Sequence, residues 1–221
     1  MAAEVSADGL DQAESWLAQD LALLEEADGF HPVVSRDDLS IGSRPMADDP
    51  NLLFRWHLPR VNAQAAVVFE GFVTRLLDYH GEWTREFSGG RVVSEPRSGM
   101  RILYQTFRPG VPGVSQRDLC SAEVVTDLPG GSRLASFRSV DALPAQPGFV
   151  RIQWWGAALC RPIDAASSEL VYLDRENQGG RFPSWLMNRM MPRYLVHQAE
   201  QVQRFFADGG PPEIRIHPSS P

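Results

Sequence analysis

Four ionisable side chains in the middle of the chain could carry acid–base chemistry: Arg117, Asp118, Glu123 and Arg138. Arg117 and Asp118 are neighbours where a predicted strand begins, so they form a catalytic pair, a solvated turn or a structural clamp that fixes how a loop enters a sheet. Glu123 follows on the same strand, and Arg138 lies on the predicted neighbouring strand. If both faced the interior they would pair, because a buried unpaired carboxylate is costly or changes its protonation. The alternative, that both point to solvent, has equal weight, since a register shift of one residue moves every side chain to the other face.

No pattern in the sequence indicates a metal or cofactor site. The histidines have no metal-ligand spacing with acids or cysteines: His31, His57, His80, His197 and His217. No Gly-rich phosphate loop, nucleophile elbow or His-Glu helix motif occurs. Cys120 and Cys160 lie in apolar strand-like segments, which favours small core residues over a disulfide or a zinc site. We therefore expect no metal and no cofactor.

The composition predicts one soluble domain. A chain of 221 residues with 43% hydrophobic content can bury a full core, so we expect a single domain over 1–221. The net charge of −7 argues against nucleic acid as a partner, because phosphate binding depends on clustered cations. The N-terminus lacks the basic and apolar regions of a secretory signal, and no apolar run reaches the roughly 18 residues that span a bilayer. We expect a cytoplasmic monomer.

Six strand-like segments in succession dominate the middle of the chain. Before them, apolar residues at three- and four-residue spacing predict an amphipathic helix over about 10–27, followed by strand-like pieces at 33–44 and 52–58. A helical region over 63–79 is broken near Gly71. The six segments, separated by Gly/Pro turns, predict an antiparallel meander: 91–95, 100–107, 118–126, 133–140, 149–160 and 169–174.

A last helix over about 183–207 is the one long element left to cover the single face that such a sheet must bury, and a flexible tail over 208–221 follows it. On one parity of the strand at 149–160 the side chains are apolar, and the last three are small: Val150, Ile152, Trp154, Gly156, Ala158 and Cys160. Small side chains leave space opposite them. The sequence therefore predicts an α+β fold whose curved antiparallel sheet encloses a hydrophobic cavity under the C-terminal helix.

Several short motifs occur in an order typical of one family. They are VSQRDL (114–119), FRSV (137–140), FVRIQWWGAALCRPI (149–163), and Gly180-x-x-Pro-x-Trp followed by Asn188. In this combination the chain resembles the START lipid-transfer family, as a bacterial-type member, over most of its length and most strongly from Tyr104 to Phe206. The resemblance implies a helix-grip fold, in which the sheet grips the last helix around a tunnel for one lipid.

The resemblance and the strand parity together suggest a set of site residues. The expected ligand-binding residues are Tyr104, Thr106, Ser121, Glu123, Arg138, Ile152, Trp154, Met187, Met191, Tyr194, Gln198 and Val202. The expected gate loop carries Phe107, Val111 and Val114. The resemblance favours Arg117 and Asp118 as a structural clamp, with catalysis a distant second. Sterol-binding members carry an acid and a base in the tunnel near positions 106 and 123, a pair that this chain does not reproduce.

The expected function is binding of one hydrophobic ligand, such as a phospholipid, sterol, hopanoid or fatty acid, for transfer or sensing and without catalysis. One alternative is a polyketide aromatase/cyclase-like enzyme in which Glu123, Arg138 or Tyr104 supplies acid–base chemistry. Another is a sensing module that acts through a partner. We expect loop 107–114 and the 187–194 part of the helix, next to a possible hinge at Pro192, to open together at a membrane surface. The acidic net charge predicts that this contact is brief and mainly apolar.

Overall fold

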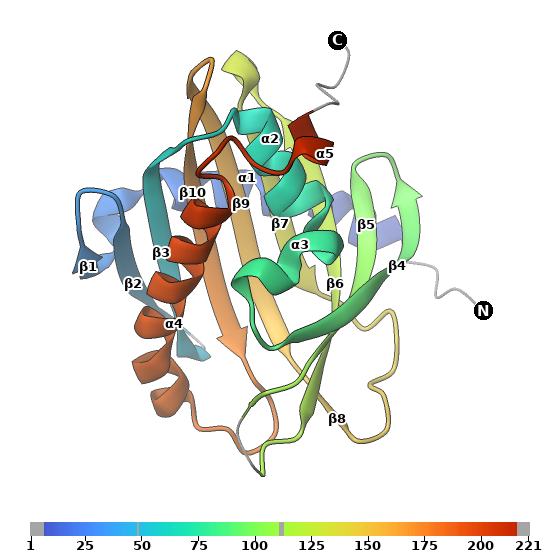
Figure 1. Ribbon diagram of the computed structural model, residues 1–221. Helices are drawn as coiled ribbons and strands as arrows, with labels where there is room; N and C mark the ends of the chain where they lie inside the picture. Colours follow the sequence, from blue (N-terminus) through green and yellow to red (C-terminus); the bar gives the residue numbers. More distant parts are fainter. Residues whose placement is uncertain (1–6, 48, 111–112, 216–221) are drawn as a thin grey trace.

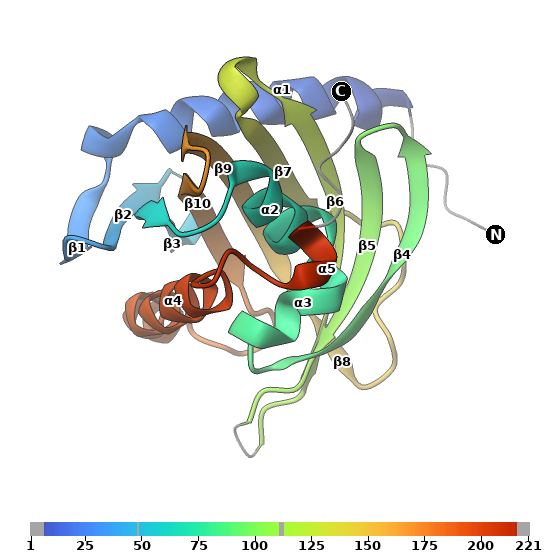
Figure 2. The ribbon, with the colours of Figure 1, turned by 45° about the horizontal axis from the view of Figure 1, so that its top comes forward.

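One long, mainly antiparallel sheet organises the chain in the computed structural model, which describes residues 7–47, 49–110 and 113–215. Its strands follow the order β1-β2-β3-β10-β9-β7-β6-β5-β4 (Figure 1). The sheet curves strongly, and Figure 2 shows α2, α3, α4 and α5 in its hollow and α1 across its outer side. The predicted α+β fold, a curved antiparallel sheet with a C-terminal helix in its hollow, is confirmed.

The strands fall where Val, Ile, aromatic and alternating apolar residues gather between Gly/Pro turns. They are β1 (His31–Ser35), β2 (Ser40–Met46), β3 (Asp49–Val61), β4 (Phe87–Arg97), β5 (Met100–Phe107), β6 (Gln116–Asp127), β7 (Arg133–Ser139), β8 (Phe149–Arg151), β9 (Gln153–Asp164) and β10 (Ser167–Asn177). Short 3-10 turns stand at Ala27–Gly29 and Pro129–Gly131. The six predicted meander strands correspond to β4 to β7, β9 and β10, and β10 then pairs with β3.

The single strand predicted over 149–160 is divided. β8 pairs in parallel with β6, whereas β9 pairs antiparallel with β7. At the break, the amide of Ile152 donates a hydrogen bond of 2.8 Å to the backbone oxygen of Asp118. The chain thus changes its pairing partner at Ile152.

Three short helical segments fill one end of the hollow. They are α2 (Ala65–Phe69), a π-helical turn (Glu70–Thr74) and α3 (Leu76–Trp83), so the predicted break near Gly71 is a π turn. A Cβ atom on Gly71 would lie 3.0 Å from side-chain atoms of Phe206 and Ile214. Glycine therefore lets the C-terminal segment approach closely.

That C-terminal segment contains one more helical turn. The tail expected to be flexible from residue 208 forms a further helical turn, α5 (Pro212–Arg215), and Ile214 is buried. Burial of Ile214 against the π turn supplies the apolar contact that holds it. Residues 216–221 lie outside the described part of the chain.

The long C-terminal helix, α4 (Ser184–Phe205), crosses the hollow with Pro183 just before it and Pro192 inside it. Its buried face repeats every three or four residues: Met187, Met191, Leu195, Gln198, Ala199 and Val202. Within the described residues, no helix is both long and apolar enough to cross a membrane.

The outer face of the sheet is also covered, which the sequence did not predict. α1 (Ala7–Glu25) lies across it, and Leu24 packs with Leu53, Trp155 and Leu173. Both faces of the middle strands are therefore buried, because α1 covers one and α2, α3 and α4 cover the other (Figure 2).

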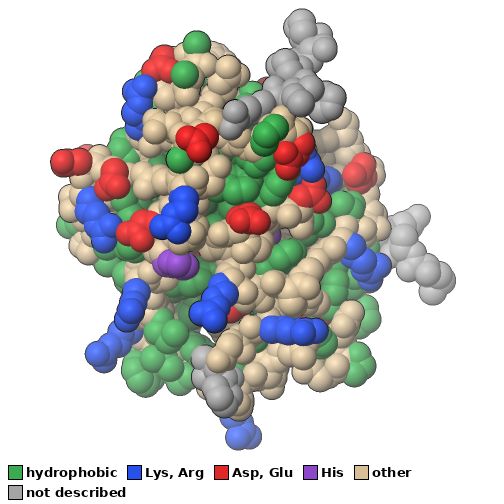
Figure 3. Space-filling model, in the orientation of Figure 1, with side chains coloured by type: hydrophobic (Ala, Val, Ile, Leu, Met, Phe, Trp, Pro, Cys, Tyr) green, Lys and Arg blue, Asp and Glu red, His purple; other side chains and the backbone are tan. Residues whose placement is uncertain are grey.

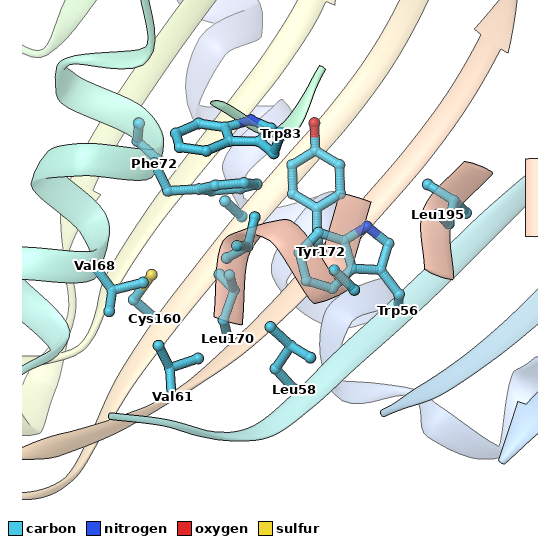
Figure 4. Packing of buried hydrophobic residues seen from close by; sticks show 14 of the residues in the cluster. Trp56, Leu58, Val61, Val68, Phe72, Trp83, Cys160, Leu170, Tyr172 and Leu195 are labelled. Atoms are coloured by element: carbon cyan, nitrogen blue, oxygen red, sulfur yellow. The ribbon is translucent and has the colours of Figure 1, made fainter. Parts of the chain in front are cut away.

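Aromatic rings form the centre of the inner core (Figure 4). The ring of Phe72 lies 5.3 Å from the rings of both Trp83 and Tyr172, and Trp56 lies 5.2 Å from Tyr172. These rings come from β3, β10 and the helices of the hollow. Tyr172 also borders the cavity between the sheet and α4, so this aromatic cluster lies at one end of that cavity.

Candidate functional site

A cavity of about 440 Å³ lies between the hollow of the sheet and α4. Ligand-binding pockets commonly have volumes of about 300–1,000 Å³. Apolar side chains form most of its wall: Phe107, Pro109, Val114, Leu119, Ile152, Trp154, Tyr172, Phe182, Leu186, Met187, Met190, Met191 and Tyr194. Polar side chains complete it: His80, Thr84, Glu86, Gln105, Arg117, Asp174, Glu176, Gln178 and Gln198.

Strand alternation determines the sheet side of this wall. Ile152 and Trp154 point into the hollow, whereas Trp155 points to the outer face, where its indole nitrogen donates to Asp20 at 2.9 Å. Gly156 makes room for the Trp154 ring, since a Cβ atom there would lie 2.7 Å from it. Trp154 also stacks on Phe137 at 4.9 Å. Trp154, which the sequence placed on the apolar parity, thus faces inward, and its neighbour Trp155 faces outward.

Two carboxyl groups from β10 enter the cavity. Asp174 and Glu176 are two residues apart, so they share the inward face with Tyr172. Burial raises the pKa of Asp174 to about 7, opposed by a 2.9 Å hydrogen bond from the indole nitrogen of Trp154. Burial first, and then the negative charges of Asp174 and Glu86, raise the pKa of Glu176 to about 8, against the opposing charge of Arg117. The two groups therefore hold protons near neutral pH.

Two other titratable groups around this pair, His80 and Tyr194, are neutral. Burial lowers the pKa of His80 to about 4, and its Nδ1 lies 2.8 Å from Oε1 of Gln105, to which it must donate. Burial raises the pKa of Tyr194, so its hydroxyl keeps its proton. The guanidinium of Arg117 donates to the backbone oxygen of Ser115 at 2.7 Å.

Several buried polar atoms at the cavity have no hydrogen-bond partner. They are Nε2 of Gln105, Nε of Arg117 and Oε1 of Gln198. The hydroxyl oxygen of Thr84 lies 3.4 Å from Nε2 of Gln198 and 3.5 Å from the hydroxyl oxygen of Tyr194. Unsatisfied buried polar atoms are uncommon in folded proteins, so the cavity offers hydrogen bonds to something other than the protein itself.

Glu123 and Arg138 do not form the predicted pair. Glu123 does face the hollow, but it lies under the π turn, where Arg101 donates to it at 2.8 Å and also reaches the backbone oxygens of Val73 and Thr74. Arg138 faces the outer side, since its strand register places it opposite Trp155, and it binds Asp20 of α1 at 2.6 and 2.8 Å. Neither side chain borders the cavity. Burial raises the pKa of Glu123 to about 7, against the opposing charge of Arg101.

The predicted Arg117–Asp118 clamp is divided between the two faces, because neighbours on a strand point to opposite sides. Arg117 borders the cavity. Asp118 binds Arg151 of β8 at 2.9 and 3.1 Å and accepts hydrogen bonds from the hydroxyl of Tyr104 and the amide of Gln146. Burial would raise the pKa of Asp118, but the hydrogen bond from Arg151 and those from Gln146 and Tyr104 outweigh it, so the pKa is lowered. Asp118 thus fastens β8 to β6 with Arg151 as its partner.

The remaining predicted site residues are distributed unevenly. Those that border the cavity are Ile152, Trp154, Met187, Met191, Tyr194, Gln198, Phe107, Val114 and Arg117. Those that do not are Tyr104, Thr106, Ser121, Glu123, Arg138 and Val202. Tyr104 faces outward, Thr106 binds Ser88 and the Gly89 backbone, and Val202 is packed in the core beyond the cavity. Val111 of the gate loop lies outside the described residues.

Sequence reasoning missed the cavity groups of β10, Asp174 and Glu176. A signal was present, because Leu170, Tyr172, Asp174 and Glu176 share one parity on that strand. Within the described residues, no three His, Cys, Asp or Glu side chains are grouped so that they could hold a metal ion.

Comparisons with known proteins agree with the fold. Residues 59–207 match the sequence model of the START domain. A human StAR-related lipid transfer protein 5 is 16% identical with a TM-score of 0.79, and the alignment covers 90% of this chain and 96% of that one. A STAR-related lipid transfer protein from Xanthomonas axonopodis (fragment 25–204) is 22% identical with a TM-score of 0.70, covering 81% of this chain and 99% of that one. No curated protein matches the sequence of this chain.

Proposed function

Since the chain belongs to the START domain family, we propose that it binds one hydrophobic molecule in the cavity beneath α4 and transfers or senses it without reaction. The observation that carries this proposal is the cavity itself, whose wall is mostly apolar side chains from β5, β6, β9, β10 and α4. Hiding apolar ligand surface from water contributes about 25 cal/mol per Å². A lipid chain is therefore bound without any catalytic group.

The surface at the N-terminal end of α4 supports contact with a membrane. Trp185 is 65% exposed and Met190, which also borders the cavity, is 50% exposed. Figure 3 shows cationic side chains over the lower part of this face, and Arg181, Arg189 and Arg193 are exposed on the same stretch of chain. Charges act over about one Debye length, ~8–10 Å, so these local cations oppose the repulsion that the net charge of −7 predicts.

Entry requires that part of the wall moves. Phe107, Pro109 and Val114, from the ends of the gate loop, line the same cavity as Met187 and Met191 of α4. Pro192 removes one backbone hydrogen bond from α4 beside these methionines. We place the gate between this loop and this part of the helix. A bacterial origin, a cytoplasmic location and a monomeric state also belong to the proposal.

An enzyme remains the second candidate because of one observation: two carboxyl groups with raised pKa values border the cavity. The groups named from the sequence for this role, Tyr104, Glu123 and Arg138, do not border it. Asp174 or Glu176 would instead supply the proton. Product analysis after incubation with polyketide-like compounds decides between the two, since turnover abolished by Asp174→Asn would favour the enzyme.

The proposed function is tested by blocking the cavity. Met191→Trp fills it from α4, and Arg193→Trp adds the same ring on the exposed side of the same helix. Native mass spectrometry of the two variants and the wild type, purified from the protein's own host, measures bound ligand. We expect bound lipid-sized mass in the wild type and in Arg193→Trp and its loss in Met191→Trp. Ligand retained equally by both variants would place binding elsewhere.

A further inference from the structure

More acidic than basic side chains border the cavity. Asp174, Glu176 and Glu86 border it, against the single arginine Arg117. In the described part of the chain, the buried carboxylates Asp20, Asp118 and Glu123 each have an arginine within 3 Å. Asp174 and Glu176 instead receive neutral hydrogen bonds, from the indole of Trp154 and the amide of Gln178. Among the described residues neither forms an ion pair with an arginine, and the charge of Arg117 only partly offsets the burial of Glu176, whose pKa stays raised.

A second feature points to a ligand that donates hydrogen bonds. Gln198 of α4 borders the cavity, is only 6% exposed, and its Oε1 has no partner. An amide oxygen can only accept. The cavity thus presents acceptors from two sides, the carboxyl groups of β10 and the amide of α4, and Arg117 and Gln105 provide the unpaired donors.

We propose that the ligand of this cavity is an apolar molecule with a protonated amine head, which Asp174 and Glu176 bind as carboxylates. This inference rests on the proposed function, because it names the class of molecule that the same cavity takes. A lone buried carboxylate is unfavourable, whereas a buried pair with good hydrogen bonds is tolerated. The ammonium provides the missing partner, and its charged hydrogen bonds are stronger than neutral ones.

Binding then displaces protons. In the free protein the two carboxyl groups hold protons near neutral pH, for the reason given above. When the ammonium enters, Asp174 and Glu176 give the protons they hold to the buffer, and the ammonium keeps its own. The charged and titratable groups that face the pair are Tyr172 from β10, Arg117 from β6, Glu86 before β4, His80 from α3 and Tyr194 from α4. Of these, Tyr172, His80 and Tyr194 stay neutral. Affinity for an amine should therefore rise with pH through the range where the two carboxyl groups ionise.

The test uses three probes with one chain and different heads: dodecylamine, 1-dodecanol and dodecanoate, each below its micelle concentration. Calorimetric titration of the whole protein at neutral pH, in two buffers with different ionisation enthalpies, measures affinity and protons released. We expect dodecylamine to bind on the order of tenfold tighter than 1-dodecanol, a difference of about 1.4 kcal/mol, and to release protons. 1-Dodecanol should release none.

Variants locate the effect. Asp174→Asn and Glu176→Gln should each lower the affinity for dodecylamine severalfold and leave that for 1-dodecanol within about twofold. Asp127→Asn, which removes a carboxylate from the exposed end of β6, is the control and should change neither. If a cavity variant fails to fold, proton release by the wild type still decides.

The outcomes separate this inference from the proposed function. Equal binding of dodecylamine and 1-dodecanol without proton release overturns the amine head and leaves hydrophobic binding intact. Tightest binding of dodecanoate also overturns it and assigns the head to Arg117. Absence of binding by all three probes contradicts the inference and the proposed function together.

Discussion

Buried carboxyl groups occur in two different settings in this molecule. In the framework, Asp20 and Asp118 each bind two nitrogens of one arginine, and each arginine joins separate elements: Arg138 holds α1 to the sheet, and Arg151 holds β8 to β6. In the cavity, Asp174 has only an indole hydrogen bond. The difference teaches that buried carboxylates paired with arginine hold elements of the fold together. The cavity carboxyl group of Asp174, which has no such partner, is available to a ligand.

Glu123 stands between these settings. Arg101 binds one of its oxygens, while the other, Oε2, is buried without a partner, and burial keeps its pKa raised to about 7. It belongs to the framework by its contacts, because Arg101 links it to the backbone of the π turn. Burial and pairing thus act against each other at a single carboxyl group.

Removing a framework carboxylate should have the largest effect. Asp118→Ala leaves Arg151, Tyr104 and the Gln146 amide without their partner, and breaking a buried pair in this way costs about 3–5 kcal/mol. Denaturant unfolding followed by circular dichroism measures the loss. A change below about 1 kcal/mol would show that the Asp118 joint is dispensable and would remove the basis of the comparison.

The two settings should also give opposite responses to pH. A carboxyl group whose pKa is raised on folding holds its proton more firmly in the folded protein than in the unfolded chain. Its contribution to stability is therefore lost as pH rises from the unfolded pKa of about 4. For Asp174 and Glu176 the loss continues through their folded pKa values of about 7 and about 8. The lowered pKa of Asp118 works the other way, and its contribution is lost as pH falls below about 4. We expect the double variant Asp174→Asn, Glu176→Gln to be more stable than wild type at pH ~8, by a gain clearly larger than its gain at pH ~5.

Urea unfolding at the two pH values measures this gain, and Asp127→Asn serves as the control for loss of charge. A double variant that is no more stable at the higher pH would show that the cavity carboxyl groups are solvated like those at the surface. The remaining slope of the double variant between pH ~5 and ~8 would belong partly to Glu123, whose pKa is also raised.

Glu123→Gln should separate architecture from binding. The substitution keeps the shape. Replacing the charged hydrogen bond from Arg101 by a neutral one lowers the unfolding free energy, whereas relief of the buried charge raises it, so we expect a net change of no more than about 1–2 kcal/mol. Affinity for a hydrophobic probe should stay unchanged, because Glu123 does not border the cavity. Parallel unfolding and fluorescence titrations check both, and a severalfold loss of affinity without loss of stability would move Glu123 to the binding site.

The smallest effect should come from an exposed pair. Asp127 binds Arg133 at 2.8 Å, but its side chain is 81% exposed. Exposed ion pairs contribute about 0–1 kcal/mol, so Asp127→Asn should lower the unfolding free energy by less than about 0.5 kcal/mol. A loss as large as that of Asp118→Ala would mean that pairing alone, without burial, distinguishes the framework.

Much of the fold was predictable because it depends on local patterns. Alternation around residues 150–160 correctly identified Ile152 and Trp154 as inward, and the Gly/Pro turns separated the meander strands. The order of motifs from Val114 to Asn188 identified the family, which the match over 59–207 confirms. α1 was predicted as a helix, but its place on the outer face of the sheet was not. Amphipathicity shows that one face of a helix is buried, but it does not show which surface of the protein that face packs against.

The sequence by itself determined the elements, the family and the inward parity of β9, because side-chain direction on a strand follows from its two-residue period. Only the tertiary structure decided which carboxyl group meets which arginine. Arg138 finds Asp20, and Asp118 finds Arg151, across more than 30 residues of chain, because strand register and the covering helices set these distances. The tertiary structure also decided the setting of Asp174 and Glu176. It places both carboxyl groups at the cavity, where neither forms an ion pair with an arginine of the described residues.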